Sequence, residues 1–153
     1  MSSPITVLIC HGFYHTPEFY QPLIDAFASH GVEAHCPQLP TSDLSKLNVV
    51  TVNDPKFNLD PPPSGYPQGE DDTKAVTESL HKLINESGKR VVMLAHSAGG
   101  WVATQSAVPE FQEKVRKEKG LEGGIIGLFY FGAFVIPVES RYIASSSRKM
   151  GIL

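Results

Sequence analysis

The stretch RVVMLAHSAGGWVATQSA, residues 90–107, decides the fold of this chain. It begins with a short continuous apolar run, which is typical of a buried strand, and it continues into a helix-like segment. Between the two stands Ser97, with Ala95 and Gly99 two residues to either side. Small residues at these positions allow a sharp turn from strand to helix that exposes the central side chain. The sequence therefore predicts a strand, a strained turn at Ser97 and a helix.

Strand and helix signals alternate on both sides of this turn. Pro17 suits the first position of a helix, and glycines end two of the helical segments. Strands are expected at residues 5–10, 32–36, 90–95 and 125–135, and helices at residues 17–30, 72–86 and 99–108. Such alternation predicts a mostly parallel sheet with right-handed crossovers in a three-layer α/β/α fold. We expect the strand order 2-1-3-4, which places a ligand crevice between the first and third strands.

The length of 153 residues suits a single domain, residues 1–153, with its core within residues 5–138. Residues 37–69 are rich in proline, asparagine, aspartate and serine, and they are expected to form one long functional or mobile loop. The tail RYIASSSRKMGIL, residues 141–153, lacks helical periodicity and is atypical of the preceding domain.

Composition and charge exclude several classes of partner. The net charge of −3 gives no nucleic-acid footprint, and the EKVRKEKG stretch mixes both signs, which indicates a solvated surface. The segment GGIIGLFYFGAFVIPV, residues 123–138, is shorter than a membrane span and contains glycine and proline, so a buried strand is expected there. Cys10 and Cys36 are predicted to be free thiols. With no signal peptide recognisable at the start, a cytoplasmic location is expected.

The turn at Ser97 matches the chemistry of acyl transfer. A serine hydroxyl attacks a carbonyl only when it is positioned and deprotonated by a base, and the resulting oxyanion needs N–H donors. One donor would be the amide of Ala98, and the other the amide of Phe13 in the loop after the first strand. His11, Gly12 and Gly99 would support the two turns, Gly12 by letting the backbone approach the substrate.

Other polar residues receive simpler interpretations. Neither a Gly-Lys-Ser/Thr phosphate loop nor a G-x-G-x-x-G fingerprint is present, and no metal site is predicted. Asp71 and Asp72 form either a paired-carboxylate site or, as we favour, a cap at the start of a helix. The remaining assignments place His96 in local contacts, His15 and His35 in polar loops, His81 on a solvated helix face and Trp101 in the packing of its helix.

The sequence resembles the α/β-hydrolase superfamily, in particular its short single-domain branch with plant methylesterases, hydroxynitrile lyases and fungal hydrolases. The resemblance covers most of residues 5–140 and rests on ITVLICHGFYHTPEFY, CPQLPTS, VVMLAHSAGGWVATQSA and GGIIGLFYFGAFVIPVES. It implies cofactor-free hydrolysis of a small ester, lactone or thioester, with Ser97 as nucleophile and the amides of Phe13 and Ala98 as the oxyanion hole. A serine at this position differs from the aspartate of the haloalkane dehalogenase and epoxide hydrolase branches.

The family order of serine, then acid, then histidine is not found here, because all six histidines precede Ser97. The acid and the base are therefore expected to be missing, and the chain to be C-terminally truncated. The alternatives are an inactive binding module, or recruitment of His15 as base. Strands that normally cover residues 125–135 would be missing as well, and the exposed apolar edge predicts poor solubility or association with a partner.

Overall fold

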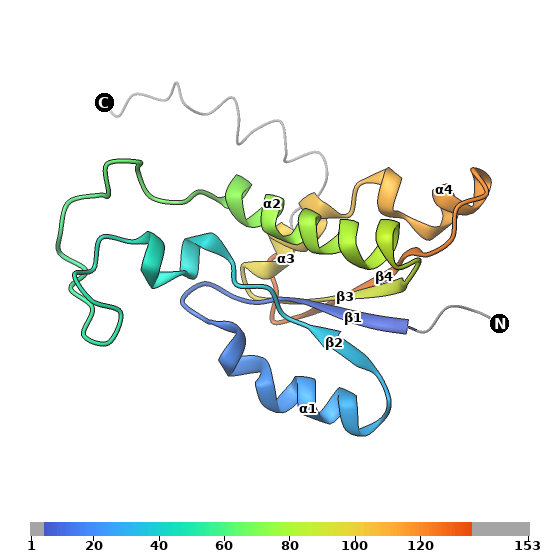
Figure 1. Ribbon diagram of the computed structural model, residues 1–153, viewed down its shortest axis with the longest axis horizontal. Helices are drawn as coiled ribbons and strands as arrows, with labels where there is room; N and C mark the ends of the chain where they lie inside the picture. The colour runs from blue at the N-terminus through green and yellow to red at the C-terminus, as the bar shows by residue number, and fades with distance from the viewer. Residues whose placement is uncertain (1–4, 136–153) are drawn as a thin grey trace.

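The computed structural model describes residues 5–135, and its centre is a four-stranded parallel sheet. The strands are β1 (Ile5–Cys10), β2 (Glu33–His35), β3 (Arg90–His96) and β4 (Gly124–Phe131). Their order is β2-β1-β3-β4, and every neighbouring pair is parallel (Figure 1). The predicted topology is confirmed, including the change of direction at β1 and β3 that opens a crevice at their carboxyl ends.

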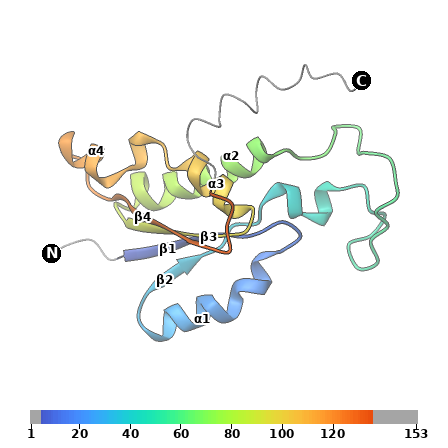
Figure 2. The same ribbon diagram turned by 180° about the vertical axis from the view of Figure 1, so that it is seen from behind.

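Helices cover both faces of the sheet (Figures 1 and 2). Helix α1 (Gln21–Ser29) lies on one face, and α2 (Gly69–Leu80), α3 (Gly99–Ser106) and α4 (Glu113–Glu118) lie on the other. Shorter turns complete the described chain: η1 (Pro17–Tyr20), η2 (Pro40–Ser42), η3 (Leu44–Lys46), the π-helical η4 (His81–Glu86) and η5 (Pro109–Phe111). None of the described helices is long and apolar enough to cross a membrane.

The core consists of two apolar clusters, one on each face of the sheet. Leu8 and Met93 point toward α2 and α3 and pack with Leu80 and Ile84, whereas Ile9 packs on the opposite side with residues of α1. Strands β1 and β3 are buried on both faces, which explains why each reads as a continuous apolar run in the sequence. These two strands hold the crevice at their carboxyl ends in place.

Several boundaries differ from the sequence-based expectations. Helix α2 begins at Gly69 because Gln68 and Asp71 form a capping box that starts it before Asp72. Strand β4 ends at Phe131, since Gly132 has a φ of 51° that turns the chain away from the sheet. The predicted tail, residues 141–153, lies outside the described residues, and so does the end of the predicted core, residues 136–138.

The expectation of a solvated charged surface at residues 113–120 is wrong in part. These residues contain α4, and Arg116 within it is buried. Its guanidinium donates to the Glu122 carbonyl at 2.9 Å and to Asn85 Oδ1 at 2.7 Å. A buried arginine is tolerated because its donors find acceptors, and the tertiary contact between α4 and η4 supplies one of them.

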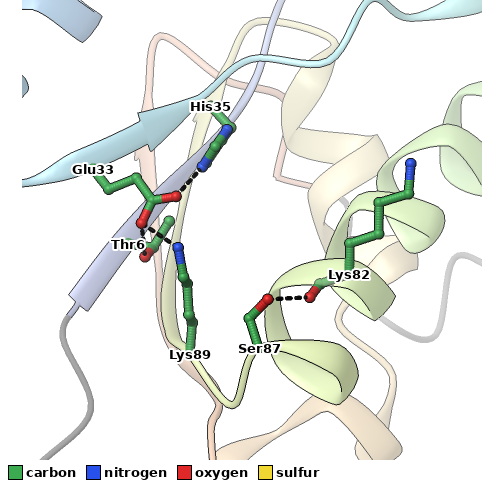
Figure 3. A network of polar contacts seen from close by, with 6 residues as sticks. All are labelled: Thr6, Glu33, His35, Lys82, Ser87 and Lys89. Atoms are coloured by element: carbon green, nitrogen blue, oxygen red, sulfur yellow. Dashed lines mark hydrogen bonds and ion pairs between the residues drawn. The ribbon is translucent and has the colours of Figure 1, made fainter.

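The two edges of the described sheet differ in character. At β2, the Glu33 carboxylate accepts from Thr6, His35 and Lys89, and so ties this strand to β1 and to the start of β3 (Figure 3). The Lys89 ammonium, followed by His35, lowers the pKa of Glu33. At β4, Phe129 is 58% exposed. Such an edge is a site for pairing with further chain, and association through it stays a prediction.

Candidate functional site

The backbone at Ser97 is strained in the way that the sequence predicts. Ser97 follows β3 directly and has a φ of 50°, in the left-handed region that a non-glycine residue rarely adopts. Such a conformation costs about 1–3 kcal/mol and persists only where the surroundings hold it. The Ser97 carbonyl accepts from the Gly100 amide at 3.1 Å and from the Phe134 amide at 2.9 Å, and these contacts fix the turn.

Glycines, which have no side chain, allow the elements around this turn to approach one another closely. A Cβ on Gly99 would lie 2.0 Å from the Cys10 carbonyl oxygen, so α3 begins in direct contact with the end of β1. A Cβ on Gly12 would lie 3.0 Å from Ser97 Cβ and 3.5 Å from Ser97 Oγ. The loop after β1 and the turn after β3 therefore meet at the serine, as expected from the strand order.

The two amides predicted as oxyanion donors have no hydrogen-bond acceptor within the described part of the chain. Within residues 5–135, neither the Phe13 nor the Ala98 N–H donates to a protein acceptor. Ala98 follows the serine and begins the turn into α3, so its N–H lies at the positive end of that helix. Both residues line one cavity. A free amide beside a cavity is available to a ligand oxygen.

His11 orients the loop that carries Phe13. Its buried ring accepts from the Leu39 amide at Nε2, at 3.0 Å, so Nδ1 carries the proton and donates to the Gly12 carbonyl at 2.9 Å. In a trans peptide the carbonyl and the following N–H point in opposite directions. Holding the Gly12 carbonyl therefore also fixes the direction of the Phe13 N–H. Burial lowers the pKa of His11, which keeps the ring neutral.

Stability is expected to fall as the pH drops below about 6.5, the unperturbed pKa of histidine. Burial lowers the pKa of both His11 and His96 in the folded protein, so in this range the unfolded chain binds more protons than the native state. This contribution to stability is fully present above the histidine pKa of the unfolded chain. It is lost progressively as the pH falls from that value to the lower pKa of the folded protein. Urea denaturation midpoints between pH 8 and pH 5 measure this loss. The variant His11→Asn keeps a donor for Gly12 but does not titrate, so a slope as steep as that of the wild type would contradict the role of His11.

A cavity of about 420 Å³ lies beside these amides. Its lining is mostly apolar, with a few polar groups: Phe13, Thr41, Pro67, Gln68, Gly69, Asp72, Ala98, Trp101, Val102 and Phe134. A second, open cavity of about 740 Å³ lies between the 45–67 loop and α2 and contains none of the predicted site residues. The smaller cavity is therefore the candidate site, because it combines mostly apolar walls with the free amides of Phe13 and Ala98.

Trp101 forms part of this cavity and is only partly buried, whereas the sequence predicts that it packs within its helix. It has both roles, since its ring also packs against the core. A Cβ on Gly69 would lie 2.5 Å from Trp101 Cζ3. The first residue of α2 therefore leaves the space that the indole ring occupies.

Asp71 and Asp72 do not act as a pair. Asp71 accepts from the Gln68 amide at 2.8 Å, which confirms the predicted cap. Asp72 is buried and accepts from the Thr41 amide at 2.9 Å and the Thr41 hydroxyl at 2.6 Å. The capping interpretation of Asp72 is therefore wrong, because the loop before α2 folds back and supplies both donors. This contact holds one wall of the cavity.

The remaining titratable groups of the sequence analysis lie in other contacts. His35 is paired with Glu33 and His81 with Glu86, both at the surface. Cys10 and Cys36 are free thiols, and burial raises the pKa of Cys36 to about 12. Among residues 5–135, no group of three or more histidine, cysteine, aspartate or glutamate side chains is arranged to hold a metal ion.

Two residues of the site have no signal in the sequence. Tyr20 contacts His96 across 76 positions of the chain, and Thr41 contacts Asp72 across 31. His96 itself makes this distant contact, so the expectation of local contacts is incomplete. His15 also bonds to Tyr20. No histidine ring in the described part of the chain hydrogen-bonds to Ser97, which leaves recruitment of His15 as base without structural support.

A parallel sheet with a strained serine in the turn between its third strand and the following helix is an arrangement of α/β folds that exposes the side chain at that turn. The chain belongs to the alpha/beta hydrolase family, whose model matches residues 7–149. No curated protein sequence matches it.

Solved structures show similarity to this chain over about half of their own length. An extracellular alpha/beta-hydrolase from a Paenibacillus species, described as sharing structural and functional homology with tobacco salicylic acid binding protein 2, is similar with a TM-score of 0.54 and 20% identity over 92% of this chain and 49% of that one. A lipase/esterase from Lactobacillus plantarum has a TM-score of 0.47 and 13% identity over 85% of this chain and 50% of that one. The chain spans about half the length of these structures.

Proposed function

We propose that this chain carries the nucleophile and the oxyanion hole of a serine hydrolase that acts on a small ester, lactone or thioester. The observation that supports this most strongly is the conjunction of a left-handed Ser97 with two free amides beside one apolar cavity. The family of the chain agrees with hydrolysis. The volume of about 420 Å³ and the apolar lining favour a small, largely apolar acyl or alcohol group.

In the proposed reaction, Ser97 Oγ attacks the substrate carbonyl carbon and its proton passes to a base. The carbonyl oxygen becomes an oxyanion that accepts from the amides of Phe13 and Ala98, and the carbonyl re-forms as the alcohol or thiol leaves with a proton. Water then attacks the acyl-serine by the same route and releases the acid. His11 acts through the Gly12–Phe13 peptide, which it orients.

We further propose that the base and its acid partner are not among these 153 residues. All six histidines precede Ser97, and among the described residues none of their rings hydrogen-bonds to it. This same observation favours a second candidate function, a catalytically inactive module that binds an ester-like ligand in the cavity. Without a base, the oxyanion hole and binding alone sustain about 10³–10⁴-fold catalysis over water.

Reaction with a fluorophosphonate probe, followed by mass spectrometry, tests the proposal. We expect slow labelling of Ser97 in the wild-type chain, acceleration by added imidazole acting as the missing base, and no adduct in Ser97→Ala. The matched control is Ser64→Ala, which removes an exposed serine in the long loop and should leave labelling unchanged.

Two results would decide against hydrolysis. An adduct on another residue would show that Ser97 is not the nucleophile. Binding of a small ester analogue in the cavity, with no adduct even in the presence of imidazole, would establish the inactive binding module instead.

A further inference from the structure

The hydroxyl of Tyr20 is the meeting point of three polar groups behind the candidate site. It accepts from the Gly12 amide at 3.1 Å and lies 3.0 Å from His15 Nδ1 and 2.7 Å from His96 Nδ1. Tyr20 is only 6% exposed, and burial raises its pKa, so the hydroxyl keeps its proton at neutral pH. Tyr20 lies at the end of η1; Gly12 and His15 lie in the loop after β1, and His96 lies at the end of β3.

The hydrogen-bonding capacity of a hydroxyl determines the state of both histidines. A tyrosine hydroxyl donates one hydrogen bond and accepts two. The Gly12 N–H occupies one acceptor position, so one imidazole Nδ1 must donate to the oxygen and the other must accept its proton. Of His15 and His96, one therefore carries a proton on Nδ1 and the other does not. Every hydrogen-bonding position of the Tyr20 hydroxyl is then used.

Ring stacking holds the same residues in place. The His96 ring stacks on Phe131 at 4.8 Å and on His15 at 5.4 Å, and His15 stacks on Phe19 at 4.9 Å. These four rings run continuously from η1 to the end of β4. The stack fixes the planes of both imidazoles, so that their Nδ1 atoms can converge on Tyr20.

The residues that Tyr20 contacts adjoin the atoms proposed to react. Gly12 precedes Phe13, and a Cβ on Gly12 would lie 3.3 Å from His96 Nδ1 and 3.0 Å from Ser97 Cβ. His96 immediately precedes Ser97. One hydroxyl thus fixes the peptide before Gly12 and the side chain before the serine. His11 fixes the next peptide through its hydrogen bond to the Gly12 carbonyl.

We propose that Tyr20 is a positioning residue that couples the oxyanion loop to the nucleophile turn through Gly12 and His96. Its effect on reactivity rests on the proposed hydrolase function, whereas the coupling itself does not. Loss of the hydroxyl leaves the buried Gly12 N–H without an acceptor and removes the partner that holds the two imidazoles in opposite states. The spacing between the Phe13 amide and Ser97 Oγ then loses one of its two supports.

Nuclear magnetic resonance of the full chain tests the coupling without reference to activity. In the wild type at pH 8, the imidazole ¹⁵N signals should show a protonated Nδ1 on one of His15 and His96 and an unprotonated Nδ1 on the other. Amide hydrogen exchange at Gly12 should be about tenfold faster in Tyr20→Phe than in the wild type. The matched control Tyr14→Phe removes a hydroxyl from a 94% exposed ring and should change neither signal.

Labelling kinetics with the fluorophosphonate probe test the consequence for the site. In Tyr20→Phe the maximal rate of Ser97 labelling should fall about tenfold while the probe concentration at half-maximal rate stays unchanged, because the cavity walls do not include Tyr20. An equal loss in Tyr14→Phe would overturn the assignment.

The two kinds of failure are distinguishable. Identical Nδ1 states for the two histidines in the wild type overturn the coupling even if Tyr20→Phe does not fold, and unchanged Gly12 exchange in a folded variant overturns it as well. Opposite Nδ1 states and protected Gly12, together with no labelling of Ser97, retain the coupling and reject the hydrolase function.

Discussion

Replacing Gly99 by alanine is expected to destabilise the protein by about 3 kcal/mol or more, a large part of the 5–15 kcal/mol that stabilises a typical domain. The new Cβ would lie 2.0 Å from the Cys10 carbonyl oxygen, 2.6 Å from its carbon and 2.7 Å from the His11 carbonyl oxygen. All three atoms belong to the backbone, so no side-chain rotation relieves the overlap. Helix α3 would have to move away from β1, and the turn at Ser97 with it.

Urea denaturation of the wild type and Gly99→Ala measures this loss. Gly127→Ala is the matched control, since a Cβ on Gly127, within β4, meets nothing within 4 Å among the described atoms. Its free energy of unfolding should change by less than about 0.5 kcal/mol. Equal midpoints for the two variants would show that α3 does not begin in contact with β1.

Replacing Asp72 by alanine is expected to cost about 3 kcal/mol of stability. The Thr41 amide and hydroxyl both donate to this buried carboxylate, and removal of the acceptor leaves these two partly buried donors without a partner. A fully buried unsatisfied group costs about 1–3 kcal/mol, and two partly buried ones together approach the upper end of that range. Because Thr41 and Asp72 line the cavity, the variant should also weaken ligand binding there. Asp72→Asn should lose less stability, since the amide oxygen still accepts one of the two bonds.

The control for Asp72 is Glu70→Ala. Glu70 is an exposed residue in the same first turn of α2, so its loss removes only a favourable interaction with the helix dipole, about 0.3–1 kcal/mol. Denaturation midpoints of the two variants separate the tertiary contact of Asp72 from the capping effect. Similar losses of stability in Asp72→Ala and Glu70→Ala would show that Asp72 acts as a helix cap, as its position in the sequence predicts.

Much of the fold follows from local patterns along the chain. Apolar runs at residues 5–10 and 90–95 predict strands buried on both faces, and glycine at position 31 predicts the end of a helix, where its φ is 71°. The helix α4 was not predicted, because its six residues carry no apolar periodicity and it is held by the tertiary contacts of Arg116.

The sequence by itself determined the order of the four strands with helices α1, α2 and α3, the strained turn at Ser97 and the meeting of that turn with the loop after β1. These depend on periodicity, on small residues at fixed offsets and on the handedness of crossovers, which act over short stretches of chain. Only the tertiary structure decided the partners of Tyr20, the role of Asp72 and the walls of the cavity. The contact between Tyr20 and His96 joins residues 76 positions apart, and that between Thr41 and Asp72 joins residues 31 positions apart. A hydroxyl or carboxylate acquires such distant partners only when the intervening chain has folded.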